Sequence, residues 1–210
     1  SAVSRGLGDV YKRQDPGLVK LGLIDDTLSA LKSNSDVLVF DNVEADPSLK
    51  TLMKCVEIGS DFKATGVIGF GGGSSMDVAK LTALLIGSNE NIHEAWGVAN
   101  AKGPRLPLVL YPTTSGTGSE VTPISIITQD DQEKKGVSSP IILPDLAILD
   151  PLLTLGLPPH TTAATGIDAM VHAIESYASK GKNNNLISKS LAKEALNLIG
   201  SSISLSLIHI

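Results

Sequence analysis

Residues 67–80 constrain the fold more than any other stretch, because a short apolar run enters three consecutive glycines and continues as an amphipathic helix. Glycine tolerates positive φ and close backbone approach, and a helix N-terminus presents unpaired N–H groups and a positive dipole end. The pattern therefore predicts a strand, a tight turn and a helix that together cradle a phosphate. Ser74 and Asp77 also fit a capping box, so a simple helix start remains the alternative. The stretch is neither the Gly-x-Gly-x-x-Gly fingerprint nor a Walker loop, and it leaves the cofactor class open.

The two ends of the chain are unusual, because one DNA sequence read on opposite strands can encode residues 9–14 and residues 205–210. The codons GAT GTG TAT AAG AGA CAG give the first segment, and their reverse complement gives the second. This DNA resembles the transposase end sequence used in sequencing-library preparation. We interpret residues 1–14 and 205–210 as translated adapter, leave them out of the fold prediction, and expect 15–204 to be an internal fragment of a longer protein.

The charge of the remaining residues argues against nucleic acid and anionic membranes as partners. Without the two ends, the 17 basic and 22 acidic residues of the chain become 14 and 21, a formal balance of −7. No apolar run approaches the ~18 residues that span a bilayer. The single cysteine, Cys55, cannot form an internal disulfide. We therefore expect a cytoplasmic protein that binds neither nucleic acid nor membrane.

Strand-like and helix-like segments alternate along most of the chain in the manner of βαβ units. The expected helices are about 17–32, 47–61 and 75–86, and the expected strands are 37–41, 65–70, 106–111, 123–128 and 146–149. This alternation predicts an α/β fold with a Rossmann-like, mostly parallel sheet and helices on both faces.

From Pro158 onward the pattern is helical, with helices expected at about 161–178 and 186–199. We predict a dinucleotide-binding α/β domain over 15–155, lacking its first strand, and the start of an all-helical domain over 156–204. The boundary falls near Pro151–Pro159, where prolines cluster.

A second candidate site is the polar loop Pro112–Glu120, which follows the apolar strand expected at 106–111. Ligands of open α/β sheets bind beyond the carboxyl ends of strands, and this loop offers hydroxyls, glycines and free amides there. A plain surface loop is the alternative. Two such loops after two parallel strands can embrace one extended, phosphate-bearing molecule, which favours a dinucleotide.

A third candidate is the pair Asp168 and His172, which lie four residues apart on an expected helix and so project from one face. Such a pair can share a cation, although a local Asp–His interaction is the commoner outcome. Two ligands also hold a metal poorly, since catalytic sites usually have at least three protein ligands. Nothing in the context of His160 directs it to the same point.

Taken in order, three motifs resemble those of the iron-containing (group III) alcohol dehydrogenase family. They are Gly71–Lys80, Pro112–Glu120, and Leu143–Pro151 leading to Gly166–Tyr177. The resemblance covers nearly all of 15–204. It implies an N-terminal dinucleotide-binding domain, a C-terminal all-helical domain, and interconversion of alcohols with aldehydes or ketones by hydride exchange with NAD(P). It also implies a homo-oligomer for the full-length protein.

The resemblance assigns cofactor contacts to individual residues. It places Gly72, Gly73 and Ser74 around the pyrophosphate, with Asp77 near the nicotinamide end. On the other side of the cofactor it places Thr113, Thr114, Thr117 and Lys135, the lysine towards the ribose.

Asp15 matches an acidic residue near the adenosine ribose. A carboxylate there accepts from a ribose hydroxyl and repels a 2′-phosphate, so NAD is favoured over NADP. Asp46 stands where relatives often carry Asn, which weakens any cofactor contact there.

Asp168 and His172 match the first two of four metal ligands in the family, whose other two are histidines beyond this chain. The resemblance thus implies Fe²⁺ or another divalent ion such as Zn²⁺, acting as a Lewis acid on the alcohol oxygen. The fragment itself is expected to be inactive. Dehydroquinate synthase-like and glycerol dehydrogenase-like enzymes of the same fold remain alternatives.

Overall fold

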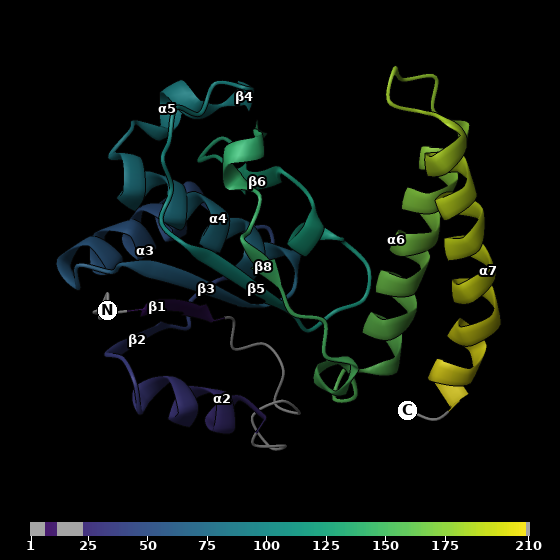
Figure 1. Cartoon of the computed structure of the whole chain (residues 1–210), viewed down its shortest axis with the longest axis horizontal. Helices are drawn as coiled ribbons and strands as arrows, with labels where there is room; N and C mark the ends of the chain where they lie inside the picture. The colour runs from purple at the N-terminus through teal and green to yellow at the C-terminus, as the bar shows by residue number, and fades with distance from the viewer. Residues whose placement is uncertain (1–6, 12–22, 209–210) are drawn as a thin grey trace. The chain divides into compact units, whose positions relative to one another are not determined.

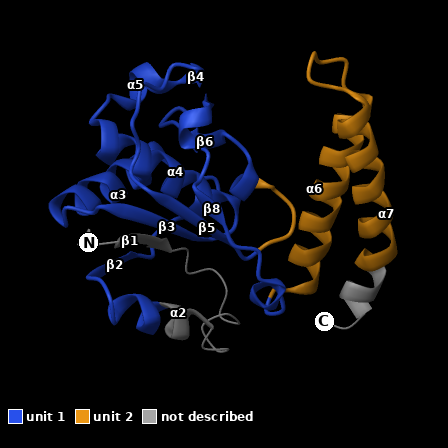
Figure 2. Cartoon of the chain, viewed as in Figure 1, with its two compact units in different colours: residues 1–113, 119–156 blue, residues 114–118, 157–210 orange. Residues whose placement is uncertain are grey.

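The structure, a computed structural model, describes the backbone of residues 7–11 and 23–208 and the side chains of residues 28–203. The chain divides into two compact units (Figure 2). Unit 1 comprises residues 1–113 and 119–156, and unit 2 comprises residues 114–118 and 157–210. The division at 156/157 falls in the proline-rich segment Pro151–Pro159.

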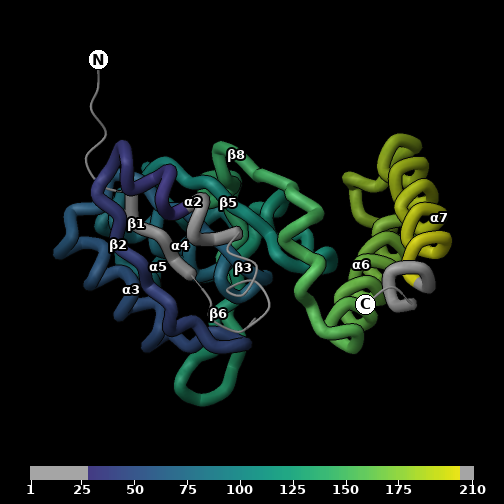
Figure 3. Tube along the Cα trace, turned by 90° about the horizontal axis from the view of Figure 1, so that it is seen from below, coloured from purple at the N-terminus to yellow at the C-terminus, as the bar shows by residue number. Residues whose placement is uncertain are grey.

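A five-stranded parallel sheet in the order β2-β1-β3-β5-β8 organises unit 1 (Figure 1). Its strands are β1 (Leu7–Tyr11), β2 (Val37–Phe40), β3 (Gly66–Gly71), β5 (Leu108–Pro112) and β8 (Leu146–Ala147). Helices α3 (Leu49–Asp61) and α4 (Gly73–Ser88) lie on one side of the sheet, and α2 (Leu23–Lys32) lies on the other (Figures 1 and 3). The expected parallel α/β sheet with helices on both faces is confirmed.

The first strand of the sheet differs from expectation. Residues 7–11, which we left out of the prediction, form β1 and pair in parallel with β2 on one side and β3 on the other. An alternating segment with a β-branched and an aromatic residue suits this position, because it satisfies backbone groups that β2 and β3 would otherwise leave unpaired. The sheet therefore does not lack this strand. The adapter origin of the segment stays a prediction.

A second, three-stranded sheet in the order β4-β7-β6 was not predicted. Its strands are β4 (Gly97–Val98), β6 (Ile124–Thr128) and β7 (Lys134–Ser138). Segment 123–128 was expected to continue the parallel pattern, but β6 instead pairs antiparallel with β7. The strand β7 begins with two lysines and lacks an apolar alternation, so its sequence carries no strand signal.

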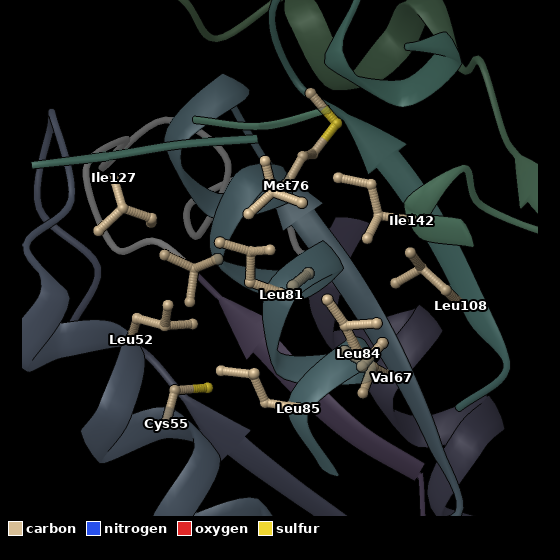
Figure 4. Packing of buried hydrophobic residues seen from close by; sticks show 14 of the residues in the cluster. Leu52, Cys55, Val67, Met76, Leu81, Leu84, Leu85, Leu108, Ile127 and Ile142 are labelled. Carbon is tan, nitrogen blue, oxygen red and sulfur yellow. The ribbon is translucent and has the colours of Figure 1, made fainter. Parts of the chain in front are cut away.

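The hydrophobic core of unit 1 surrounds α4, whose side chains are buried on nearly every side (Figure 4). Met76, Leu81 and Leu84 are fully buried, and they pack with Leu52 of α3 and Leu108 of β5. We expected an amphipathic helix here, but the few polar residues of α4 form no continuous polar face, and such a helix belongs inside a core rather than on a surface. The position of α4 between the sheet, α3 and β6 follows from this.

Short elements complete unit 1. They are the helix α5 (Ile92–Ala95) and the 3₁₀ turns η1 (Ser119–Val121), η2 (Pro140–Ile142) and η3 (Pro151–Thr154). Arg105 clamps the start of β5 to the turn before β8 through a bidentate pair with Asp145, at 2.7 and 2.9 Å. The guanidinium of Arg105 holds the pKa of Asp145 below its usual range.

Unit 2 consists of the hairpin of α6 (Pro159–Ala178) and α7 (Leu186–Ile208), together with the loop 114–118. Gly166 lets the two helices approach closely, because a Cβ atom there would lie 2.8 Å from Cδ1 of Ile203. Large apolar side chains remain exposed on both helices, among them Ile167, Ile174, Leu186, Ile187 and Leu191. The helix α7 continues to Ile208, nine residues beyond the predicted end, because no glycine or proline follows Gly200 to stop it.

Candidate functional site

The glycine turn between β3 and α4 forms the first part of the site. Gly71 closes β3 with φ of 140°, a conformation that favours glycine. Gly72 is the N-cap of α4 and offers no side-chain hydrogen bond, and the N–H of Met76 makes a helical bond to Gly72 O at 3.2 Å. The N–H groups of the first helical turn have no intrahelical acceptor by geometry. They and the helix dipole therefore suit an anion.

The structure decides against the capping-box alternative. The helix starts at Gly73 rather than after Ser74, and its cap is Gly72. The Asp77 carboxylate does not turn back to the cap, because it accepts from Ser119 Oγ at 2.6 Å and from Ile126 N at 2.9 Å. The start of α4 therefore has no side-chain capping hydrogen bond among the described residues.

Close packing brings this helix start to the carboxyl edge of the sheet. A Cβ atom on Gly69 would lie 2.5 Å from Leu110 Cδ2 and 2.8 Å from Ala79 Cβ. The missing side chain lets α4 rest directly on β3 and β5. In the sheet register, Gly71 is the partner of Pro112, so the two candidate loops leave neighbouring strands at the same level.

The two loops are also joined by hydrogen bonds. Thr113, which begins the polar loop, is buried, and its N–H donates to Gly71 O at 3.0 Å. Ser119, where the loop returns to unit 1, bonds to Asp77 of α4. Thr114 and Thr117 belong to the segment that groups with unit 2. There Gly116 approaches the backbone of α6 closely, since a Cβ atom on it would lie 2.7 Å from Thr165 O.

Sequence reasoning missed Lys80 as part of this arrangement. Lys80 is fully buried, and its Nζ donates to Ser119 Oγ and to Ile124 O, each at 2.8 Å. Burial lowers the pKa of Lys80 to about 8, opposed by the nearby carboxylates of Asp77 and Glu120. Burial also raises the pKa of Asp77. A signal was present: a single lysine on a mostly apolar helix without a continuous polar face is expected to be buried and paired.

Three further residues that the family resemblance brought up are Lys135, Asp46 and Asp15. Lys135 lies on β7, partly exposed, with its Nζ 3.6 Å from a carboxylate oxygen of Glu133. Asp46 accepts from Lys134 Nζ at 2.7 Å, which supplies a surface ion pair. Asp15 falls outside the described residues, so its assigned ribose contact stays a prediction.

The candidate metal ligands lie on α6 in unit 2. His172 Nε2 is 3.7 Å from Asp168 Oδ1, and both side chains are about half exposed. The helix thus presents the two ligand atoms on one face, as their spacing predicts. Within the described residues, no group of three or more His, Cys, Asp or Glu side chains could hold a metal ion. His160 is exposed and contacts its neighbour, with Thr161 Oγ1 3.4 Å from its Nδ1.

Comparison with known families decides the identity of these motifs. The profile of the iron-containing alcohol dehydrogenases matches residues 8–151, and that of the Fe-containing alcohol dehydrogenase C-terminal region matches residues 162–209. The chain belongs to the iron-containing alcohol dehydrogenase family. The family match therefore covers both the glycine turn and the Asp168–His172 helix.

Two curated proteins are similar over most of the chain. Long-chain-alcohol dehydrogenase 1 of Geobacillus thermodenitrificans is 44% identical over 90% of this chain and 48% of its own length. Sulfoacetaldehyde reductase of Bilophila wadsworthia is 39% identical over 90% of this chain and 49% of its own length. The chain spans about half the length of the curated relatives it matches.

A solved structure is also similar over nearly the whole chain. Sulfoacetaldehyde reductase from Bifidobacterium kashiwanohense, in complex with NAD⁺, superposes with a TM-score of 0.87 at 31% identity. The superposition covers 98% of this chain and 54% of that one. In the described part of our chain, no helix is both long and apolar enough to cross a membrane.

Proposed function

We propose that the full-length protein is an NAD-dependent, divalent-metal alcohol dehydrogenase that interconverts small alcohols with aldehydes or ketones. One observation carries the proposal: an uncapped helix N-terminus behind a glycine turn and an Asp–His pair at i,i+4 occur in one chain of the iron-containing family. The relatives support it by their names, which describe alcohol dehydrogenases and an aldehyde reductase. The glycine turn alone would fit many phosphate ligands.

The residues around the glycine turn fit a dinucleotide pyrophosphate. Gly72 and Gly73 place no Cβ atom over the helix start, so a phosphate can approach the backbone N–H groups directly. The hydroxyl of Ser75 is buried and has no hydrogen-bond partner in the part of the chain that the structure describes. A buried hydroxyl without a partner is costly, and a phosphate oxygen at the helix start is a suitable acceptor class. The proposed role of Gly72, Gly73 and Ser75 is to bind and orient the cofactor.

The residues on α6 fit half of a metal site. Asp168 and His172 supply one carboxylate and one imidazole, donors that bind Fe²⁺ and Zn²⁺. Their half-exposed side chains leave room for further ligands, which we propose are two histidines in the C-terminal half of the full-length protein. When bound, the metal supplies Lewis-acid polarisation of the alcohol oxygen, and NAD supplies the hydride acceptor.

We further propose NAD rather than NADP as the preferred cofactor, on the basis of Asp15 at the sequence level. A carboxylate beside the adenosine ribose repels a 2′-phosphate. The full-length protein is also proposed to be a cytoplasmic homo-oligomer.

A dehydroquinate synthase-like reaction is less well supported, because it needs basic residues near the substrate. The basic residues of unit 2, Lys180, Lys182, Lys189 and Lys193, lie beyond α6 and on α7.

The direct test is an activity assay of the full-length protein with its C-terminal half restored. We expect reduction of NAD⁺ with a small primary alcohol when Fe²⁺ or Zn²⁺ is supplied, followed as NADH absorbance. Loss of activity on chelation and recovery on adding metal complete the expected result. Activity with NADP⁺ in preference to NAD⁺ would contradict the role assigned to Asp15. Failure to reduce either cofactor with any alcohol would contradict the proposed function.

A further inference from the structure

Lys80 is the largest fully buried side chain among the described residues. Lysine is almost never fully buried unless it is paired, because desolvating an ammonium group costs several kcal/mol. Here the Nζ atom lies 3.8 Å from Asp77 Oδ1, in addition to its two hydrogen bonds. An apolar residue would fill this core position at no such cost. A buried lysine at this position therefore indicates a role for its hydrogen bonds to Ser119 and Ile124.

Lys80 and Asp77, one turn apart on α4, together hold two segments that follow the polar loop. Ser119 Oγ accepts from Lys80 Nζ and donates to Asp77 Oδ1. The strand β6 is held at two further points: the backbone N–H of Ile126 donates to Asp77 Oδ2, and the side-chain hydroxyl of Ser125 donates to the backbone carbonyl of Asp77, each at 2.9 Å. Both oxygens of the Asp77 carboxylate thus accept from protein donors.

These bonds fix both ends of the polar loop to the elements that form the glycine turn. At one end, Thr113 N donates to Gly71 O at the close of β3. At the other end, Ser119 is held by Asp77 and Lys80 in the second turn of α4. All of these contacts lie within unit 1. Direct hydrogen bonds within unit 1 therefore hold the two ends of the polar loop, Thr113 and Ser119, next to β3 and α4.

We propose that Lys80 is a positioning residue for dinucleotide binding: without touching the dinucleotide, it anchors Ser119, the end of the polar loop that lies in unit 1, to the second turn of α4. Asp77 belongs to the same hydrogen-bond network, because it accepts from Ser119 Oγ and Ile126 N. The inference rests on the proposed function for the nature of the ligand. Its benefit is preorganisation: a loop that is already ordered does not lose its conformational entropy when the ligand binds.

The test uses the full-length protein and two measurements. Hydrogen exchange of the amides of residues 113–121 without cofactor reports the order of the loop, and titration with NADH reports the Kd. We expect Lys80→Met to speed loop exchange and to raise the Kd by roughly 10-fold. Ser119→Ala should have a similar effect and serves the same test if Lys80→Met fails to fold. The double variant should be no worse than the more severe single variant, because both remove one connection.

Two matched controls separate positioning from general destabilisation. Leu52→Ala opens a cavity in the same core without touching the network, and Lys54→Met removes an exposed lysine from α3. Both should leave loop exchange and the Kd for NADH within about 2-fold of the unsubstituted protein. A Kd raised equally by Leu52→Ala and Lys80→Met, or loop exchange unchanged in Lys80→Met and Ser119→Ala, would overturn the positioning role. If the unsubstituted protein does not bind NADH, the proposed function is contradicted. The positioning role is tested separately even then, because it fails if hydrogen exchange of residues 113–121 is the same in Lys80→Met and in the unsubstituted protein.

Discussion

The ammonium of Lys80 and the carboxylate of Asp77 lie 3.8 Å apart inside the core, and the hydroxyl of Ser119 bonds to both. Burial acts on the two groups in opposite directions, since it raises the pKa of Asp77 and lowers the pKa of Lys80 to about 8. Removing two charges from water costs free energy that their attraction only partly offsets, so such a pair adds little net stability. The protonation of Lys80 should be visible in the pH dependence of unfolding, because its pKa differs between the folded and unfolded protein.

Stability should rise with pH relative to a variant without the buried amine. The pKa of Lys80 in the folded protein, about 8, lies below its ordinary value of 10.5, so the unfolded chain binds more protons between these values. The cost of burying the charge is fully present below about pH 8 and is relieved as the pH rises towards 10.5. In urea unfolding, the stability of the unsubstituted protein minus that of Lys80→Met should increase from about pH 7 to about pH 10. A difference that does not vary with pH, or one matched by Lys54→Met, would show that the amine titrates as in water.

Replacing Gly73 by Val should weaken cofactor binding. A branched side chain at the first residue of α4 blocks the approach of a pyrophosphate to the backbone N–H groups. We expect the Kd for NADH to rise at least ~10-fold, about 1.4 kcal/mol. Fluorescence titration measures this directly. An unchanged Kd would mean that the glycines serve only the turn.

Gly69 offers a test of how closely α4 must approach the sheet. In Gly69→Ala, the new Cβ atom would meet Leu110 Cδ2 at 2.5 Å and Ala79 Cβ at 2.8 Å, so we expect a loss of ~1–3 kcal/mol in the free energy of unfolding. Gly136→Ala is the matched control, since its Cβ atom would meet Ser125 O at an ordinary 3.5 Å. Equal stability of the two variants in urea unfolding would show that the close approach is unimportant.

The sequence indicated the central elements of unit 1 because their signals are local. A buried strand followed by glycines and an apolar helix identifies β3, the turn and α4 wherever they lie in the chain. The helix start was placed too late, because glycine at the cap and at the first helical position gives no positive signal. The hairpin of β6 and β7 was missed because Lys134 and Lys135 interrupt the strand pattern, and pairing with β6 overrides that weak local preference.

The site shows the same division between local and long-range information. The pair Asp168 and His172 could be predicted from spacing alone, because four residues on a helix set the geometry. The contact of Lys80 with Ser119 joins residues 39 positions apart, and no local pattern encodes it. The strand formed by residues 7–11 was excluded on grounds of origin, whereas its folding depends only on an extended segment fitting between β2 and β3.

The chain of residues 1–210 taken by itself should be poorly soluble. Leu186 is 85% exposed and Ile187 is 72% exposed, and further apolar side chains lie open on both helices of unit 2. Exposed apolar surface of this kind promotes association. Light scattering after size exclusion should show oligomers or aggregate, and a variant carrying Ile187→Lys with Leu191→Lys should reduce them. A monodisperse monomer with a cooperative thermal transition would contradict this expectation.

Metal content tests the central claim most directly. Elemental analysis should find about one divalent ion per chain in the full-length protein and much less in His172→Ala, because one of four ligands is removed. The value of kcat/KM should fall ~10²-fold or more, about 3 kcal/mol, while the Kd for NADH stays nearly unchanged. The chain of residues 1–210 should hold little metal with or without His172, because Asp168 and His172 supply only two ligands. Full, tightly bound metal in His172→Ala, or in residues 1–210 alone, would contradict the account and place the metal at other ligands.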